Sequence, residues 1–305
     1  MTLPNFFIIG AEKAGTTSLY NYLAEHPQIF MSPVKEPRYF SHDPARSRTQ
    51  KWGHQVTDPA VYESLFAGVR GETAIGEASP NYFSTPRASA AIRAQLPQAR
   101  FIVSLRNPVD RAYSMYWMLR RNYVWTRRFE EEIEGVFDEL RAAGVELETL
   151  LAPEDFPFRL TAYLYKGLYA LHLRRWFALF ARPQFLLLRF EDIERDPAAV
   201  SRLAYEFLGV DSEYSLKNRE AFGRSGEVQR PRLFRAIQNF RYGAFLRRLI
   251  PPWLVLRARN RLVDLSLGGY PPMDQATRAR LVEFFRPDIL ETEKLLGWDL
   301  QSWLE

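Results

Sequence analysis

The chain has 305 residues, of which 47% are hydrophobic and 14% aromatic, so it can bury a substantial core and disorder is not expected. Its formal net charge of +5, from 41 Lys and Arg against 36 Asp and Glu, favours anionic ligands in general without implying nucleic acid. The absence of cysteine excludes disulfides and thiolate sites, and the four scattered histidines lack metal-ligand spacing, so we expect no metal.

Three strand-then-helix units follow one another along the chain. Residues 6–9 are continuously apolar, which is typical of a strand buried on both faces of a parallel sheet, and a helix is expected from about Thr17. A second strand is predicted at 99–106, and a third at 184–193, before a helix that Gly209 closes. These units predict an α/β fold with a central parallel sheet flanked by helices.

The chain is expected to form one domain over residues 1–305. No repeat or low-complexity linker divides it, and helical or loop insertions are expected around 40–70, 127–165 and 215–275. A C-terminal helix around Leu281 should pack back on the body. The N-terminus lacks the features of a signal peptide, and no window approaches the roughly 18 apolar residues of a membrane span. We therefore expect a soluble, cytoplasmic protein.

The loop after the first strand has the composition of a phosphate-binding turn. Glycines let a backbone approach an anion, and the unpaired N–H groups at a helix start point toward it. Gly10 and Gly15 bound this loop, but Lys13 lies inside it and not directly after the second glycine, as a Walker A loop requires. A phosphate-binding loop is therefore favoured over a ligand-free turn, while metal-dependent γ-phosphoryl transfer is poorly supported.

Two segments resemble sulfotransferases that use 3′-phosphoadenosine 5′-phosphosulfate (PAPS) as donor. KAGTTSL, at 13–19, resembles the 5′-phosphosulfate loop [KR]xGT[TS]xL, and RNPVDRAYSMY, at 106–116, is similar to the 3′-phosphate segment R[DN]PxxRxxSxY. The similarity extends over most of the chain, nearest to the glycan-type and bacterial branches. It implies the P-loop-like sulfotransferase fold, PAPS as donor, 3′,5′-bisphosphorylated adenosine (PAP) as product, and no metal.

The resemblance also implies which residues bind the donor. The 5′-phosphosulfate would be held by the first loop, which comprises Lys13, Ala14, Gly15, Thr16, Thr17 and Ser18. Arg106 and Ser114 would hold the 3′-phosphate, since a guanidinium at a strand end and a hydroxyl about two turns into the next helix can converge on one phosphate. The family's late donor-covering loop has no clean copy here. The candidates are Arg224, Ser225 and Gly226, with 266–274 as the alternative.

Sulfuryl transfer needs a base for the acceptor proton and positive charge at the leaving phosphate. In the branch that this chain resembles, a glutamate in an ExxFF-like segment is the base, and EPRYF places Glu36 there. Its neighbours Lys35 and Arg38 would favour the ionised carboxylate, and Lys13 would stabilise the breaking bond.

The acceptor contacts and the rival bases are less constrained. Three residues are predicted to contact the acceptor: Arg38, Glu77 and Asn81. Glu77 and Asn81 could equally well hold their own loop. Glycan-modifying relatives have a lysine where this chain has Ala78, which weakens a polysaccharide acceptor. His26 and His42 are rival bases, although His26 fits better as a residue at a helix C-terminus.

The predicted function is in-line transfer of a sulfuryl group from PAPS to the hydroxyl of a saccharide, a lipid or a small-molecule alcohol. Two alternatives stay open: a P-loop-like ATP-dependent kinase or phosphotransferase, and a non-catalytic module that binds phosphate or a membrane surface. Residues 241–261 hold six arginines around an apolar centre, which could meet anionic lipid, but a solvated basic face is favoured.

Overall fold

The structure is a computed structural model of the chain. It describes residues 2–42, 55–123, 127–144, 158–220 and 271–305, together with residues 262, 268 and 269.

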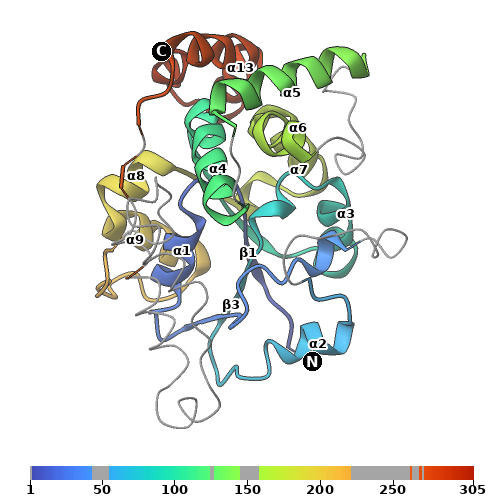
Figure 1. The fold of residues 1–305 in the computed structure, drawn as a ribbon. Helices are drawn as coiled ribbons and strands as arrows, with labels where there is room; N and C mark the ends of the chain where they lie inside the picture. Colours follow the sequence, from blue (N-terminus) through green and yellow to red (C-terminus); the bar gives the residue numbers. More distant parts are fainter. Residues whose placement is uncertain are drawn as a thin grey trace.

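A five-stranded parallel sheet forms the centre of the described structure (Figure 1). Its strands are β1 (Phe6–Gly10), β2 (Ile29–Met31), β3 (Ala74–Ala78), β4 (Arg100–Leu105) and β5 (Phe185–Arg189). Their order across the sheet is β2-β3-β1-β4-β5, and every adjacent pair is parallel. The carboxyl ends of all five strands therefore lie at one edge, which we call the carboxyl edge. The predicted α/β fold with a central parallel sheet is confirmed.

Helices cover both faces of the sheet. Because side chains alternate along a strand, Phe7 and Ile9 of β1 enter one core while Phe6 and Ile8 enter another. The first core lies beneath α3 (Pro86–Gln95), α4 (Pro108–Tyr123), α7 (Tyr169–Leu179) and α13 (Gln275–Leu296). The second core lies beneath α1 (Thr16–Leu23) and α9 (Pro197–Leu208). Figure 1 shows α1 and α9 on one side of β1, and α3 and α7 on the other.

The remaining elements are short or peripheral. They are the helices α2 (Pro59–Ser64), α5 (Phe129–Ala143), α6 (Phe158–Tyr163) and α8 (Phe190–Arg195), and the 3-10 turns η1 (Tyr39–Ser41), η2 (Pro80–Tyr82), η5 (Tyr165–Gly167), η6 (Arg182–Gln184) and η7 (Gln301–Leu304). The predicted packing of the C-terminal helix is confirmed, since Leu281 and Phe285 of α13 are fully buried. None of the described helices has both the length and the apolar character needed to cross a membrane.

Three strands differ from the sequence prediction. The sequence pattern does not predict β2 or β3. β2 has only three residues, and β3 contains Gly76 and Glu77, which interrupt its apolar run. Gly76 is required by packing, since a Cβ there would overlap the ring of Phe6. β5 ends at Arg189 because the next residues begin α8, whose first turn carries two acidic side chains that suit a helix N-terminus.

Candidate active site

The strand order reverses at β1, which lies between β3 and β4. In open parallel sheets, ligands bind in the crevice outside the carboxyl ends at such a point. The loop 11–15 follows β1 and Arg106 follows β4, so both flank this crevice. Glu36 follows β2 and Ser79 follows β3 at the same edge. The topology thus brings the two predicted phosphate-binding segments and the predicted base to one edge of the sheet.

The loop between β1 and α1 is fixed by packing and by a hydrogen-bonding serine. Gly15 has a φ of 80°, in the left-handed region, and a Cβ there would lie 3.1 Å from a ring carbon of Phe190. The hydroxyl of Ser104 on β4 lies 3.3 Å from the carbonyl oxygen of Gly10 and 2.5 Å from that of Ala14. The loop therefore presents the first N–H groups of α1, which have no partner within the helix, in a fixed position.

The three hydroxyls at the start of α1 are not equally accessible. Thr16 and Ser18 are buried, whereas Thr17 is partly exposed. Of these three hydroxyls, the Thr17 hydroxyl is therefore the one that an anion at the loop can reach, in addition to the backbone N–H groups and Lys13. The predicted direct contacts of the other two hydroxyls stay predictions.

Lys13 lies in a cluster of cations. Burial lowers its pKa most, and repulsion by Arg121, Arg106 and Lys35 lowers it further, while Glu12 opposes them, so that the pKa falls to about 7 from an ordinary value of 10.5. A cluster of like charges disfavours its own protonation until an anion binds. This part of the site is therefore built to receive negative charge.

Arg106 connects three segments around the crevice. Its Nη1 donates to the carbonyl oxygen of Lys13 at 3.3 Å, and its guanidinium lies over the ring of Phe190, 4.4 Å from the centroid. Its own carbonyl oxygen accepts a hydrogen bond from the Tyr169 hydroxyl at 2.8 Å. No carboxylate in the described part of the chain forms an ion pair with Arg106. Its charge is thus available to an anionic ligand.

The second predicted phosphate ligand, Ser114, is buried on α4. Arg111, one turn before it, is also buried, and its Nη2 donates to the carbonyl oxygens of Ala162 at 3.0 Å and Tyr163 at 2.6 Å. Arg111 therefore holds α6 against α4 and does not line the crevice. The convergence of Arg106 and Ser114 on one phosphate stays a prediction.

Both carboxylate oxygens of Glu36 are ion-paired. Lys35 Nζ lies 2.7 Å from Oε1, and Arg38 Nη2 lies 2.6 Å from Oε2. Burial raises the pKa of Glu36, but these two cations outweigh it and lower the pKa to about 2. The carboxylate is therefore ionised, which is the state that the predicted role as a base requires, and both of its oxygens are already in contact with a cation.

Glu77, on β3, lies in a buried hydrogen-bonded network beside the Glu36 segment. Its Oε1 accepts from the Ser79 hydroxyl at 2.6 Å, and its Oε2 accepts from the Tyr62 hydroxyl. Ser79 Oγ in turn accepts from the backbone N–H of Arg38 at 3.1 Å. Burial raises the pKa of Glu77 to about 7 despite the hydrogen bonds. Glu77 is 0% exposed and supports the loop from beneath, which agrees with the alternative that it holds its own loop, and the acceptor contact stays a prediction.

This support matters because two residues of the loop have left-handed backbone. Glu36 has a φ of 62° and Arg38 a φ of 56°, a region that costs free energy for residues other than glycine. The hydrogen bond from Glu36 N–H to the Ala78 carbonyl, at 2.9 Å, and the one from Arg38 to Ser79 hold this conformation.

The other predicted candidates divide between described and undescribed residues. Asn81 lies in η2 and donates from Nδ2 to Ser41 Oγ at 2.9 Å, so an acceptor contact stays a prediction. His26 lies just beyond α1, buried, with Nε2 2.9 Å from the Asp211 carbonyl oxygen and Nδ1 accepting from a backbone N–H, which excludes it as the base. His42 follows η1 and stays a rival base. The segment 241–261 lies outside the described residues, as do Arg224, Ser225 and Gly226.

Sequence reasoning missed several residues of the site. Arg121 could have been predicted from the sequence. It lies seven residues after Ser114 on α4, and because seven residues are about two helical turns, both residues lie on one face of the helix. No sequence pattern predicts Phe190 or Tyr62, because the contacts of Phe190 with Gly15 and of Tyr62 with Glu77 depend on the order of the strands in the sheet.

Comparison with known proteins agrees with this geometry. A family model described as a sulfotransferase domain matches residues 3–224. Over 99% of its length the chain is 28% identical to bifunctional heparan sulfate N-deacetylase/N-sulfotransferase 4 of Mus musculus and 29% identical to bifunctional heparan sulfate N-deacetylase/N-sulfotransferase 3 of Homo sapiens. It spans 31% of the length of these relatives. A solved sulfotransferase from Alicyclobacillus acidocaldarius is 29% identical, with a TM-score of 0.72 and 100% of both chains covered.

Proposed function

The chain belongs to the sulfotransferase domain family, and from this membership we propose that it is an enzyme that transfers a sulfuryl group from PAPS to a hydroxyl or amine of an acceptor. The observation that carries the proposal is the position of the two family segments. The loop 11–15 and Arg106 follow β1 and β4, which are neighbours in the sheet, and the Arg106 side chain contacts the Lys13 carbonyl. A donor with phosphate groups at both ends fits two cationic segments that meet in this way.

The chain's own groups fit the donor's charges. The N–H groups that begin α1 and the Lys13 ammonium would hold the 5′-phosphosulfate, and Arg106 and Ser114 would hold the 3′-phosphate. The donor supplies the sulfuryl group and a phosphate that leaves with the electron pair of the broken S–O bond. Lys13 would balance the negative charge that develops on that phosphate.

Glu36 would take the proton that the acceptor loses. Its pKa of about 2 makes it ionised but weakly basic while Lys35 and Arg38 hold both oxygens. An acceptor that takes over one of these contacts would remove a stabilising cation and so raise the pKa of the carboxylate. Acceptor binding would thereby prepare the base at the moment that it is needed.

The acceptor class is proposed as a saccharide, a lipid or a small molecule with a hydroxyl or amine group. The printed names of the relatives include N-sulfotransferases, which adds amines to the hydroxyl acceptors that the sequence predicts. The ATP-dependent phosphotransferase alternative is not favoured, since no lysine follows Gly15 and the family match is to sulfotransferases.

The test compares wild type with Glu36→Gln. Sulfated product is measured with radiolabelled PAPS against a panel of alcohols and amines, and PAP affinity is measured by calorimetry. We expect Glu36→Gln to lose at least roughly a hundredfold in turnover, as for removal of a general base, while it keeps its affinity for PAP. Unchanged turnover in Glu36→Gln would refute the base assignment. No product from wild type with any acceptor, together with no PAP binding, would refute the proposed reaction itself.

A further inference from the structure

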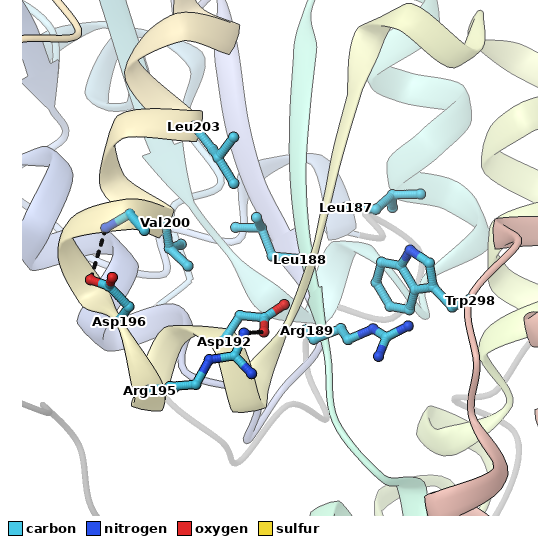
Figure 2. Close-up of a pocket in the computed structure, with 10 residues that line it drawn as sticks. Leu187, Leu188, Arg189, Asp192, Arg195, Asp196, Val200, Leu203 and Trp298 are labelled. Carbon is cyan, nitrogen blue, oxygen red and sulfur yellow. Dashed lines mark hydrogen bonds and ion pairs between the residues drawn. The ribbon is translucent and has the colours of Figure 1, made fainter.

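A second candidate site lies beside the edge strand β5, outside the carboxyl-edge crevice. It is a pocket of about 300 Å³ between β5, α8, the first turns of α9 and Trp298, which follows the end of α13 (Figure 2). None of the residues predicted to bind donor or acceptor lines it. The proposed reaction therefore leaves this pocket unexplained.

Much of the pocket wall is hydrocarbon. Leu188 and Val200 are buried beneath it, whereas Leu203 is 49% exposed at its rim. Figure 2 shows these three side chains on one side of the β5 ribbon and Leu187 with the Trp298 indole on the other. An apolar body placed against β5, which is an edge strand among the described residues, would cover both groups and remove this surface from water.

Of the charged side chains that line the pocket, some already interact with a partner inside the protein, whereas Arg189 does not pair with a carboxylate of the described residues. Asp192 pairs with Arg195 at 2.5 Å, and Asp196 caps α9 by accepting from the backbone N–H of Ala199 at 3.0 Å. Arg189 pairs with no carboxylate in the described part of the chain. Its guanidinium extends toward the indole of Trp298 and lies 5.0 Å from the ring centroid (Figure 2).

We propose that this pocket binds a small organic oxyanion with one negative charge and a hydrocarbon body. Arg189 donates two parallel hydrogen bonds to the oxyanion, a geometry that its planar guanidinium favours. The hydrocarbon body lies against Leu188, Leu203 and Trp298. The volume of about 300 Å³ suits a small molecule, at the lower end of the range of ligand pockets. The proposal does not depend on the sulfuryl-transfer reaction, because no group assigned to that reaction takes part.

The test uses octyl sulfate as the probe, below its micelle concentration, on the whole chain saturated with PAP. Octan-1-ol lacks the charge and inorganic sulfate lacks the hydrocarbon, so they are matched control ligands. In isothermal titration calorimetry we expect one octyl sulfate site. Octan-1-ol should bind at least roughly tenfold more weakly, as for loss of a charge-assisted hydrogen bond, and inorganic sulfate should bind more weakly by at least a similar factor, because it buries no hydrocarbon.

Two variants and one matched control locate the site. Arg189→Gln and Leu203→Asp should each weaken octyl sulfate binding by roughly tenfold or more, by loss of the cation and by a repelling carboxylate. Because Leu203 is exposed, Leu203→Asp should fold normally, and it therefore still tests the site if Arg189→Gln fails to fold. Arg182→Gln is the control, since Arg182 also lies over an aromatic ring, 4.4 Å from the centroid of Phe177, but outside the pocket.

Three results would overturn the proposal. They are equal affinity of wild type and Arg189→Gln for octyl sulfate, equal affinity of wild type for octan-1-ol and octyl sulfate, and an octyl sulfate site that is present in a parallel titration without PAP but absent when PAP saturates the chain. The last result would place the probe in the carboxyl-edge crevice. A chain that makes no sulfated product and binds no PAP, but still binds octyl sulfate through Arg189, would refute the proposed reaction and leave this pocket standing.

Discussion

Lys13 shows how a single side chain can tie donor binding to pH. With a pKa of about 7, it is only partly charged at neutral pH, because burial and the neighbouring cations disfavour its ammonium form. A bound phosphosulfate or phosphate would favour that form and raise its pKa. We therefore expect donor binding near pH 7 to 8 to be coupled to uptake of a proton.

This coupling predicts a pH dependence of donor affinity. Below pH 7 Lys13 is charged in the free protein and affinity is greatest. As pH rises above about 7, affinity should fall, by up to roughly tenfold per pH unit, until the pKa of the complex is reached. Calorimetry with PAP at pH 6, 7, 8 and 9 measures this slope. Lys13→Met should bind more weakly at low pH and should lose the slope between pH 7 and 9; an unchanged slope would contradict the role of Lys13.

The raised pKa of Glu77 leads to a second prediction, which concerns the pH dependence of folding stability and not of ligand binding. Its folded pKa of about 7 lies above the ordinary value of 4.5, so the folded state binds the extra proton between these two values. The contribution of Glu77 to stability is fully present below about pH 4.5 and is lost as pH rises through 7.

Glu77→Gln should remove this pH dependence. Relative to wild type, the variant's free energy of unfolding should rise between pH 5 and pH 7.5 by roughly 1 to 3 kcal/mol, which is the scale of a shift of two pKa units. Urea unfolding at both pH values measures the difference. The isosteric amide can still accept a hydrogen bond from the Ser79 hydroxyl with its oxygen and can donate one from its NH2 group to the Tyr62 oxygen, so PAP affinity is the control and should not change. If the difference in free energy of unfolding between wild type and Glu77→Gln were the same at pH 5 and pH 7.5, Glu77 would be excluded as the titrating group.

At the scale of elements, α7 and α13 are joined by a capping interaction across the molecule. Asp288 of α13 accepts hydrogen bonds from the backbone N–H groups of Ala170 at 3.1 Å and Leu171 at 3.3 Å, in the first turn of α7. The residue before α7 is Leu168, which has no side-chain cap to offer. The C-terminal helix therefore supplies a helix cap that the local sequence lacks.

We expect Asp288→Ala to lower the free energy of unfolding by roughly 1 to 2 kcal/mol, the usual loss for an N-cap. Asp288→Asn should retain part of the stabilisation that the cap provides, because the amide oxygen still accepts a hydrogen bond. Glu283→Ala is the matched control on the same helix, since its side chain is 78% exposed and its exposed ion pair contributes little. Chemical denaturation followed by circular dichroism checks all three, and equal effects of Asp288→Ala and Glu283→Ala would refute the cap.

The sequence predicts elements well where they are long or bounded by turn residues, and less well elsewhere. β1 and β4 are read from continuous apolar runs, and α9 from its closing glycine, which has a φ of 76°. β2 has three residues, too few for any periodicity, and the position of β3 between β1 and β2 depends on pairing across the sheet. The same holds for the site: motif spacing finds Lys13 and Arg106, but not that Glu77 is enclosed by residues distant in sequence.

At the scale of the whole molecule, we expect the charges at the carboxyl edge to decide which nucleotide stabilises the fold. A ligand that binds only the folded chain raises the unfolding temperature. PAP has phosphates for both the loop 11–15 and Arg106, whereas ATP with Mg²⁺ has none at the 3′ position. The chain has no Walker lysine after Gly15 to hold a triphosphate.

We therefore expect PAP to raise the melting temperature by several degrees at a hundredfold excess over its dissociation constant, and ATP with Mg²⁺ to raise it much less. Arg106→Ala should remove most of the advantage of PAP over adenosine 5′-phosphate. Differential scanning fluorimetry measures all of these. Larger stabilisation by ATP with Mg²⁺ would favour the phosphotransferase alternative, and an Arg106→Ala variant with undiminished preference for PAP would contradict the 3′-phosphate site.

The short helix α8 touches both candidate sites. Phe190 and Ile193 face Gly15 of the donor loop, and Asp192 and Arg195, between and beyond them, line the β5 pocket. Thermodynamic linkage then sets a strict condition: whatever factor pocket occupancy applies to PAP affinity, PAP applies to the affinity of the pocket. A six-residue helix would thus couple the affinities of two unrelated ligands that occupy separate sites.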